Sequence, residues 1–280
     1  MVYALRLDAT PPLSASESQE IFLMKRIAAP VLLVLSLFVF TSTCFAAEGL
    51  MLKIDSDASD LEGDYKAFYL NAGNLLELGG GIVGAGIIAN TKADREIRNY
   101  YQERLRSSAT YSVSSVARVP GELYVTVPLL LAVHLMIPQD YGAVDVWAQK
   151  SLRALFLGGP LGLVLQRAIG AERPAHDDSR WRPFKSSHGL SGHTFVGGVP
   201  FIMAARMEDN IYLKSMFYGL SVLPGLSRIN DDQHYFSQVV LGWYLAYLSS
   251  SVVDRKTDGK VSFAATPQNG GLVLRFNAIF

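Results

Sequence analysis

Apolar stretches of helical length make up most of this chain from Tyr65 onward, and short charged or Gly/Pro-bearing breaks separate them. Within the stretches, apolar residues recur every three or four positions, which is the spacing of one face of an α-helix. This pattern predicts an all-α fold, a helical bundle. The predicted helices cover residues 66–91, 94–117, 121–137, 144–166, 193–207, 211–225 and 235–253.

Strand signals occur only near the C-terminal end of the sequence. Val261 to Ala265 and Gly271 to Phe276 flank Pro267-Gln268-Asn269-Gly270, and an Asn-Gly pair between two apolar runs is typical of a β-hairpin turn. We therefore expect a small hairpin within a C-terminal tail over residues 256–280.

Composition limits the domain organisation and excludes one class of partner. The chain has 280 residues, of which half are apolar, and this is enough for one large domain with its own core, which we place at residues 47–255. Because the formal net charge is zero, no overall basic field draws the protein to nucleic acid. Cys44 is the only cysteine, so an intramolecular disulfide is excluded.

The N-terminal segment has the pattern of a secretory signal. Met24-Lys25-Arg26 precedes the apolar run from Ile27 to Phe40, and small residues follow up to Ala46 and Ala47. This order of charged, apolar and small-residue regions predicts a signal peptide over residues 24–46 and export to the periplasm.

Two further expectations concern this segment. Residues 1–23 lack the signal pattern, so we interpret them as an extension of the gene model ahead of a start at Met24. Lipid attachment at Cys44 is the alternative to simple cleavage, and the residues Thr41-Ser42-Thr43 before it disfavour that alternative.

Two predicted helices approach the length and composition of a membrane span. Residues 235–253 are uncharged and residues 70–91 contain only Glu77 as a charge, whereas a bilayer core of about 30 Å takes about 20 apolar residues. We expect a domain peripheral to, or partly embedded in, the inner membrane. Ionisable residues argue against a span in other predicted helices: Glu122, His134 and Arg153.

Three short segments combine the residue types that handle phosphate. They are Arg173-Pro174, Ser191-Gly192-His193, and Ser227-Arg228 with His234 six positions after the arginine. Arginine has a planar fork that matches phosphate oxygens, glycine lets the backbone approach an anion, and histidine attacks phosphorus or passes a proton near neutral pH. Antiparallel packing of the intervening helices places all three at one end of the bundle.

Each segment taken alone has a simpler explanation. Pro174 ends a helix, Ser191 caps the start of one, and Arg228 caps the end of one in many proteins. Two arginines, two histidines and a glycine turn at one bundle end, however, indicate a phosphate pocket.

The order and spacing of these segments resemble the type 2 phosphatidic acid phosphatase and vanadium haloperoxidase superfamily over residues 166–238. The family pattern is Lys, six residues, Arg-Pro; then Pro-Ser-Gly-His; then Ser-Arg, five residues, His, three residues, Asp. The resemblance implies a helical bundle of that family's type and a phosphatase, a phosphoric ester hydrolase that needs no metal.

The resemblance also implies a role for each matching residue. His234 would be the nucleophile that takes the phosphoryl group, and His193 the acid that protonates the leaving oxygen. The phosphate oxygens would be held by Arg173, Ser191, the amide of Gly192, and Arg228.

Three positions depart from the family pattern: Gln166 in place of the lysine, Leu190 in place of the proline, and Gln238 in place of the aspartate. Arg167 would reach the phosphate if the helix end is irregular. A carboxylate at position 238 would fix the tautomer of the nucleophilic histidine and stabilise its imidazolium, whereas an amide only orients it. Asp231 or Asp232 is a candidate replacement for that carboxylate.

The substrate that the resemblance implies is an amphiphilic phosphate, a lipid phosphate or an isoprenyl diphosphate, in the bacterial envelope. Three alternatives remain: a family member that binds phosphate without turnover, a soluble nonspecific acid phosphatase, and a haloperoxidase. Only the last would carry a cofactor, vanadate.

Overall fold

The computed structural model describes residues 46–137, 142–258, 261–268 and 271–278. The predicted extension, Cys44 and nearly all of the predicted signal peptide lie outside these ranges. The chain divides into two compact units, Met1–Asp55 and Ser56–Phe280. All three phosphate-handling segments belong to the second unit.

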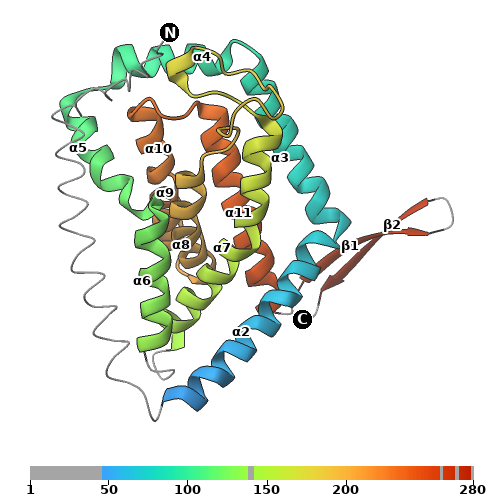
Figure 1. Cartoon of the computed structure of the whole chain (residues 1–280). Coiled ribbons are helices and arrows are strands. Elements are labelled where there is room, and N and C mark those ends of the chain that lie inside the picture. Colours follow the sequence, from blue (N-terminus) through green and yellow to red (C-terminus); the bar gives the residue numbers. More distant parts are fainter. Residues whose placement is uncertain (1–45, 138–141, 259–260, 269–270, 279–280) are drawn as a thin grey trace, which may run out of the picture. The chain divides into compact units, whose positions relative to one another are not determined.

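The described residues are mostly helical, which confirms the predicted all-α fold (Figure 1). The α-helices are α2 (Ala46–Tyr69), α3 (Ala72–Asn90), α4 (Ala93–Tyr100), α5 (Ser108–Ala117), α6 (Leu123–Met136), α7 (Gly142–Ile169), α8 (Gly192–Met207), α9 (Ile211–Ser221), α10 (Leu223–Asn230) and α11 (Phe236–Asp258). Short π and 3₁₀ turns lie between them: η1 (Tyr101–Leu105), η2 (Val119–Gly121) and η4 (Pro174–His176).

The structure divides three of the predicted helices into shorter pieces. The range 66–91 breaks at Asn71, whose side chain caps α3 by accepting hydrogen bonds from the amides of Gly73 and Asn74. The range 94–117 breaks before Ser107, which caps α5. The range 211–225 breaks at Val222, because Pro224 favours the first turn of a new helix, α10.

A helix also occurs where none was expected. The polar, acidic stretch before Tyr65 belongs to α2. This part of the helix has no apolar stripe, and it contacts α7 through ion pairs instead. Arg153 of α7 donates two hydrogen bonds to Asp64, of 2.7 and 2.8 Å, and one of 2.9 Å to Asp60. The carboxylates therefore compensate a buried cation.

The C-terminal hairpin forms as predicted. Strands β1 (Val261–Gln268) and β2 (Gly271–Ala278) pair antiparallel, with Val261 opposite Ala278 and Gln268 opposite Gly271.

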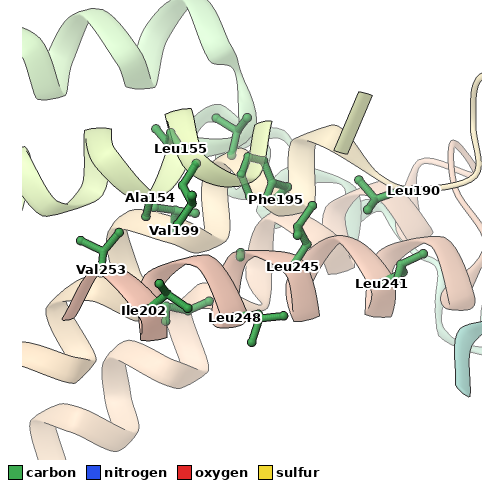
Figure 2. Packing of buried hydrophobic residues seen from close by; sticks show 14 of the residues in the cluster. Ala154, Leu155, Leu190, Phe195, Val199, Ile202, Leu241, Leu245, Leu248 and Val253 are labelled. Atoms are coloured by element: carbon green, nitrogen blue, oxygen red, sulfur yellow. The ribbon is translucent and has the colours of Figure 1, made fainter. Parts of the chain in front are cut away.

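Helix α11 lies at the centre of the bundle, where it packs against α3, α7 and α8 (Figure 1). Figure 2 shows the core that these helices share, in which Leu155 of α7, Phe195 of α8 and Leu245 of α11 meet. Each such side chain contributes roughly 1.5–3 kcal/mol when fully buried. Because Gly242 has no side chain, α11 can approach the start of α8 closely: a Cβ there would lie 2.5 Å from the carbonyl oxygen of Ser191. This contact fixes α11 against the start of α8.

Three helices in the described ranges are long and apolar enough to cross a membrane: α3, residues Gly142–His176 including α7, and residues Phe236–Arg255 of α11. They number four if Ser108–Gly121 and Leu123–Met136, bent by 55°, form one span. Exposed apolar side chains on α3, including Leu76, Val83 and Ile87, also fit a lipid surround. These features support association with a membrane.

The expectation that Arg153 argues against a span in this region was wrong. Arg153 lies near the start of α7, where it pairs with Asp64. Between Ala154 and Ala171 the only charged residue is Arg167. An apolar stretch of sufficient length therefore follows the buried ion pair.

Candidate active site

The three phosphate-handling segments meet at one end of the bundle, where Gln238 contacts two of them and the residue that precedes the third. Its side-chain Nε2 donates to the carbonyl oxygen of Glu172, next to Arg173, at 2.8 Å. Its backbone carbonyl accepts from the amide of Ser191 at 2.9 Å. Its Oε1 lies 2.8 Å from Nδ1 of His234. Gln238, one of the three residues that depart from the family pattern, thus links the parts of the pocket by hydrogen bonds.

The hydrogen bonds of Gln238 determine which nitrogen of His234 is free to react. Because Nε2 of Gln238 donates to Glu172, the amide is oriented with its oxygen toward His234, and the same oxygen accepts from the amide of Tyr235 at 3.1 Å. An amide oxygen only accepts, so Nδ1 of His234 carries the proton. Nε2 therefore holds the lone pair of a nucleophile.

His234 is buried, with 8% of its surface exposed. Burial lowers the pKa of His234 to about 3; the Gln238 hydrogen bond acts in the opposite direction, and the cations of Arg228 and Arg173 lower the pKa further. The imidazole is consequently neutral at neutral pH, which is the form that attacks phosphorus.

The loop between α10 and α11 holds His234 through its two aspartates. Asp232 has a left-handed backbone (φ 54°) and accepts two hydrogen bonds from Arg98 of α4, of 2.7 and 2.6 Å. Asp231 accepts from Ser114 of α5 at 2.7 Å. The expectation that one of these carboxylates replaces the family's aspartate was wrong, since Nδ1 of His234 bonds to Gln238.

The first turn of α11 is capped from another helix. Asp94 of α4 is fully buried, and its carboxylate accepts from the backbone amide of Ser237 at 2.8 Å and from the Ser237 hydroxyl. An acceptor at this position satisfies a free amide of the helix start. Asp94 thereby fixes the end of α11 that follows His234.

The two arginines of the pocket differ in exposure and in hydrogen bonding. Arg173 is exposed and donates to Oε1 of Gln233 at 2.9 Å. Arg228 is 12% exposed, and its Nη1 lies 3.7 Å from Asp231. Within the described residues the buried Nε of Arg228 has no partner. A buried charged donor without an acceptor is costly, so an anion in the pocket would satisfy it.

Ser191 and Gly192 form the start of α8. Ser191 is fully buried, and its hydroxyl oxygen accepts from the amide and the hydroxyl of Thr194, at 3.4 and 2.8 Å. Ser191 is therefore the N-cap of α8, which is the simpler explanation of this residue given by the sequence. The backbone amides that follow, beginning with Gly192, form a helix N-terminus suited to an anion.

His193 pairs with a residue that the sequence analysis assigned no role in the site. Its Nε2 lies 3.3 Å from Oε1 of Glu122, between η2 and α6. The backbone of the preceding Gly121 is so close to His193 that a Cβ there would lie 2.8 Å from the carbonyl oxygen of His193. No local pattern marks Glu122, because the pair joins residues far apart in the sequence.

A cavity of about 340 Å³ begins at His193 and extends between α6, α7 and α8. Its polar lining groups include Glu122, Gln166 and His193, and most of its wall is apolar. Leu123 and Leu163, at its edge, are 59% and 67% exposed. The complete lining is Gly121, Glu122, Leu123, Tyr124, Leu155, Gly159, Gly162, Leu163, Gln166, Leu190, Gly192, His193, Phe195 and Val196.

The structure separates Gln166 from Arg167. The side chain of Gln166 donates to the carbonyl oxygen of Leu190 at 3.1 Å and lines the cavity. Helix α7 continues to Ile169, so Arg167 is rotated by about 100° from Gln166. The irregular helix end that would bring Arg167 to the phosphate is absent here, and Arg167 is exposed.

A third histidine, His188, lies beside the pocket, and the sequence patterns did not identify it. The ring centre of His188 is 6.3 Å from that of His234. His188 belongs to the polar stretch between α7 and α8, in which no spacing pattern distinguishes it. Only the folded loop brings it to His234.

Part of the chain matches a known protein family. Residues 149–258 match the model of the PAP2 superfamily. A search of curated proteins and a search of solved structures found no match. The matched segment contains Arg173, Ser191, Gly192, His193, Arg228 and His234. Over residues 149–258 the chain is therefore similar to the PAP2 superfamily, the type 2 phosphatidic acid phosphatase and haloperoxidase superfamily, whose members are generally phosphatases.

Proposed function

We propose that the protein is a phosphatase that hydrolyses a lipid phosphate or an isoprenyl diphosphate through a phosphohistidine at His234. The observation that carries this proposal is the cavity of about 340 Å³, which is polar beside His193 and apolar over most of its remaining wall. A ligand that fits such a cavity has a charged head and a hydrocarbon chain. A phosphate ester at the pocket would direct its chain into the apolar part.

In the first step, the lone pair on Nε2 of His234 attacks phosphorus. The bond from phosphorus to the leaving oxygen breaks, and His193 gives that oxygen a proton. Arg173, Arg228 and the amides at the start of α8 offset the charge on the equatorial oxygens. Glu122 orients the His193 ring, since their side chains lie 3.3 Å apart.

In the second step, water attacks the phosphorus from the side that the leaving group vacated. His193, now neutral, takes a proton from the water, and the nitrogen–phosphorus bond breaks. Inorganic phosphate leaves and His234 returns to its neutral form. Gln238 keeps the proton on Nδ1 throughout, because its oxygen accepts that hydrogen bond. Without a carboxylate, the phosphorylated ring receives less electrostatic stabilisation than a His–Asp pair would give.

The proposed location is the periplasmic side of the inner membrane in a bacterial envelope. The apolar helices support membrane association, and the signal-like pattern of residues 24–46 supports export. A site at the membrane surface would receive an amphiphilic substrate directly from the lipid phase. Neither nucleic acid nor a resident cofactor is part of the proposal.

The test is phosphate release by the full chain, purified in detergent. The substrates are a long-chain phosphatidic acid, an isoprenyl diphosphate and p-nitrophenyl phosphate. We expect faster turnover of the two amphiphiles and an acid-labile phosphoryl group that is lost in His234→Gln. The matched control is His176→Gln, which changes a histidine whose side chain is 66% exposed.

Each alternative predicts a different result. Turnover of p-nitrophenyl phosphate alone would favour a soluble acid phosphatase. Phosphate binding without release from any substrate would favour an inactive binding protein. Bromide oxidation with added vanadate and peroxide would favour a haloperoxidase.

A further inference from the structure

His188 lies outside the three phosphate-handling segments, yet its ring lies close to that of the proposed nucleophile. The ring centres of His188 and His234 are 6.3 Å apart and the rings are tilted by 54°. His188 is half-buried in the loop that precedes α8. The charged and titratable groups that act on it are Arg173, Glu172 and His176, together with His234.

One ring nitrogen of His188 is used by the loop and the other is available. Nδ1 lies 2.9 Å from the hydroxyl of Ser186. Within the described part of the chain, Nε2 of His188 has no hydrogen-bond partner. The Ser186 contact orients the ring and leaves Nε2 for a ligand.

The separation of the two rings fits a shared oxygen atom. At 6.3 Å between centres, the rings are too far apart for a direct hydrogen bond with good geometry. An oxygen that is bonded to His234 Nε2 through phosphorus and accepts one hydrogen bond of about 2.8 Å from His188 does span ring nitrogens at this separation. A nonbridging oxygen of a phosphoryl group on or next to His234 would occupy that position.

Several other polar groups of the pocket already make hydrogen bonds within the protein. Arg173 donates through Nη1 to Gln233, and the Gln166 amide donates to the Leu190 carbonyl. Gln238 is engaged with Glu172 and His234. A phosphate dianion has three nonbridging oxygens to satisfy, and His188 supplies an additional imidazole beside His234.

We propose that His188 is a phosphate-binding residue, which donates from Nε2 to a nonbridging oxygen and gains a proton when the phosphate dianion binds. This inference rests on the proposed function and adds a residue to its pocket. It makes phosphate affinity dependent on pH, because a protonated imidazole is a stronger donor to an anion than a neutral one.

The electrostatic surroundings agree with proton gain on binding. Burial, and then the cation of Arg173, lower the pKa of His188 below its ordinary value. The free ring is therefore mostly neutral at pH 7. A phosphate dianion beside the ring favours its charged form, so binding raises the pKa and draws a proton from solution.

The experiment is isothermal titration calorimetry of the full chain with inorganic phosphate at pH 7. Titrations in two buffers of different ionisation enthalpy give the number of protons taken up on binding. We compare wild type with His188→Gln, His188→Lys and the matched control His176→Gln. Because inorganic phosphate itself titrates near this pH, the result is the difference in proton uptake between each variant and wild type.

We expect His188→Gln to weaken phosphate binding about tenfold and to take up fewer protons than wild type. His188→Lys carries a fixed charge, so it should recover the affinity without the extra proton. His176→Gln should change both quantities much less than His188→Gln, because the His176 side chain is 66% exposed and acts on His188 only as a distant charge. Equal affinity and equal proton uptake in His188→Gln and wild type would overturn the inference. A wild-type protein that binds no phosphate would instead overturn the proposed function.

Discussion

Nδ1 of His234 lies 2.8 Å from Oε1 of Gln238, one helical turn further along the chain. The amide donates its own N–H to the carbonyl oxygen of Glu172, at 2.8 Å, so it cannot rotate without losing that hydrogen bond. Gln238 thus selects the tautomer of His234 as a carboxylate would, but it adds no negative charge. The remaining difference from a His–Asp pair is electrostatic.

Gln238→Asp should shift the pH range in which His234 is active. A carboxylate near the imidazole favours its protonated form and raises the pKa of His234 from about 3. Only the neutral ring attacks, so kcat/KM should begin to fall at a higher pH on the acid side. Gln238→Asn is the matched control, since it has the same length without the charge. Identical acid limbs in the Asp and Asn variants would contradict this prediction.

His234 should make the protein less stable in acid. Its pKa in the folded protein, about 3, lies below the ordinary value near 6.5, so the unfolded chain binds the proton first. Its contribution is lost as pH falls from about 6.5 toward 3, at about 1.4 kcal/mol per pH unit. Thermal unfolding followed by circular dichroism between pH 7 and pH 4 should show a smaller acid loss in His234→Gln. An equal loss in both proteins would refute the assignment.

Asp94→Ala should destabilise α11 and lower turnover. The change removes the acceptor of the Ser237 amide, at 2.8 Å, and of the Ser237 hydroxyl. Loss of a buried cap costs about 2 kcal/mol. Ser237→Ala is the control, because it keeps the amide bond and loses only the hydroxyl. Unfolding midpoints and kcat are measured together, and equal effects of the two changes would argue against a capping role for Asp94.

Gly159→Leu should discriminate between long-chain and short substrates. Gly159 lines the cavity, and no atom lies within 4 Å of a Cβ placed there. A leucine would fill space that a hydrocarbon chain needs, and each excluded methylene costs about 0.8 kcal/mol. KM for a long-chain lipid phosphate should rise about tenfold, while p-nitrophenyl phosphate is hydrolysed as before. Gly219→Leu, at an exposed and equally open position on α9, controls for the change in helix propensity. A parallel rise for both substrates would count against a chain-binding cavity.

Local sequence patterns were sufficient for most helices and for the three phosphate-handling segments. Periodicity of apolar residues is a property of neighbouring positions, so it located α7, α8 and α11 within a few residues. It did not locate α2, because this helix is held by contacts such as Asp64 with Arg153, which lie far apart in the sequence. Breaks such as Asn71 depend on a capping hydrogen bond that apolar spacing does not encode.

Local residue patterns predicted an all-α chain and a C-terminal hairpin. They also identified the residues that match the family pattern: Arg173, Ser191, Gly192, His193, Arg228 and His234. Only the tertiary structure placed Glu122 beside His193, His188 beside His234, and Gln238 between His234 and Glu172. Except for His234 and Gln238, these pairs join residues that are distant in the sequence, so they form only when the helices and loops pack together. Gln166 and Arg167, adjacent in sequence, differ in position because a helix turns by about 100° per residue.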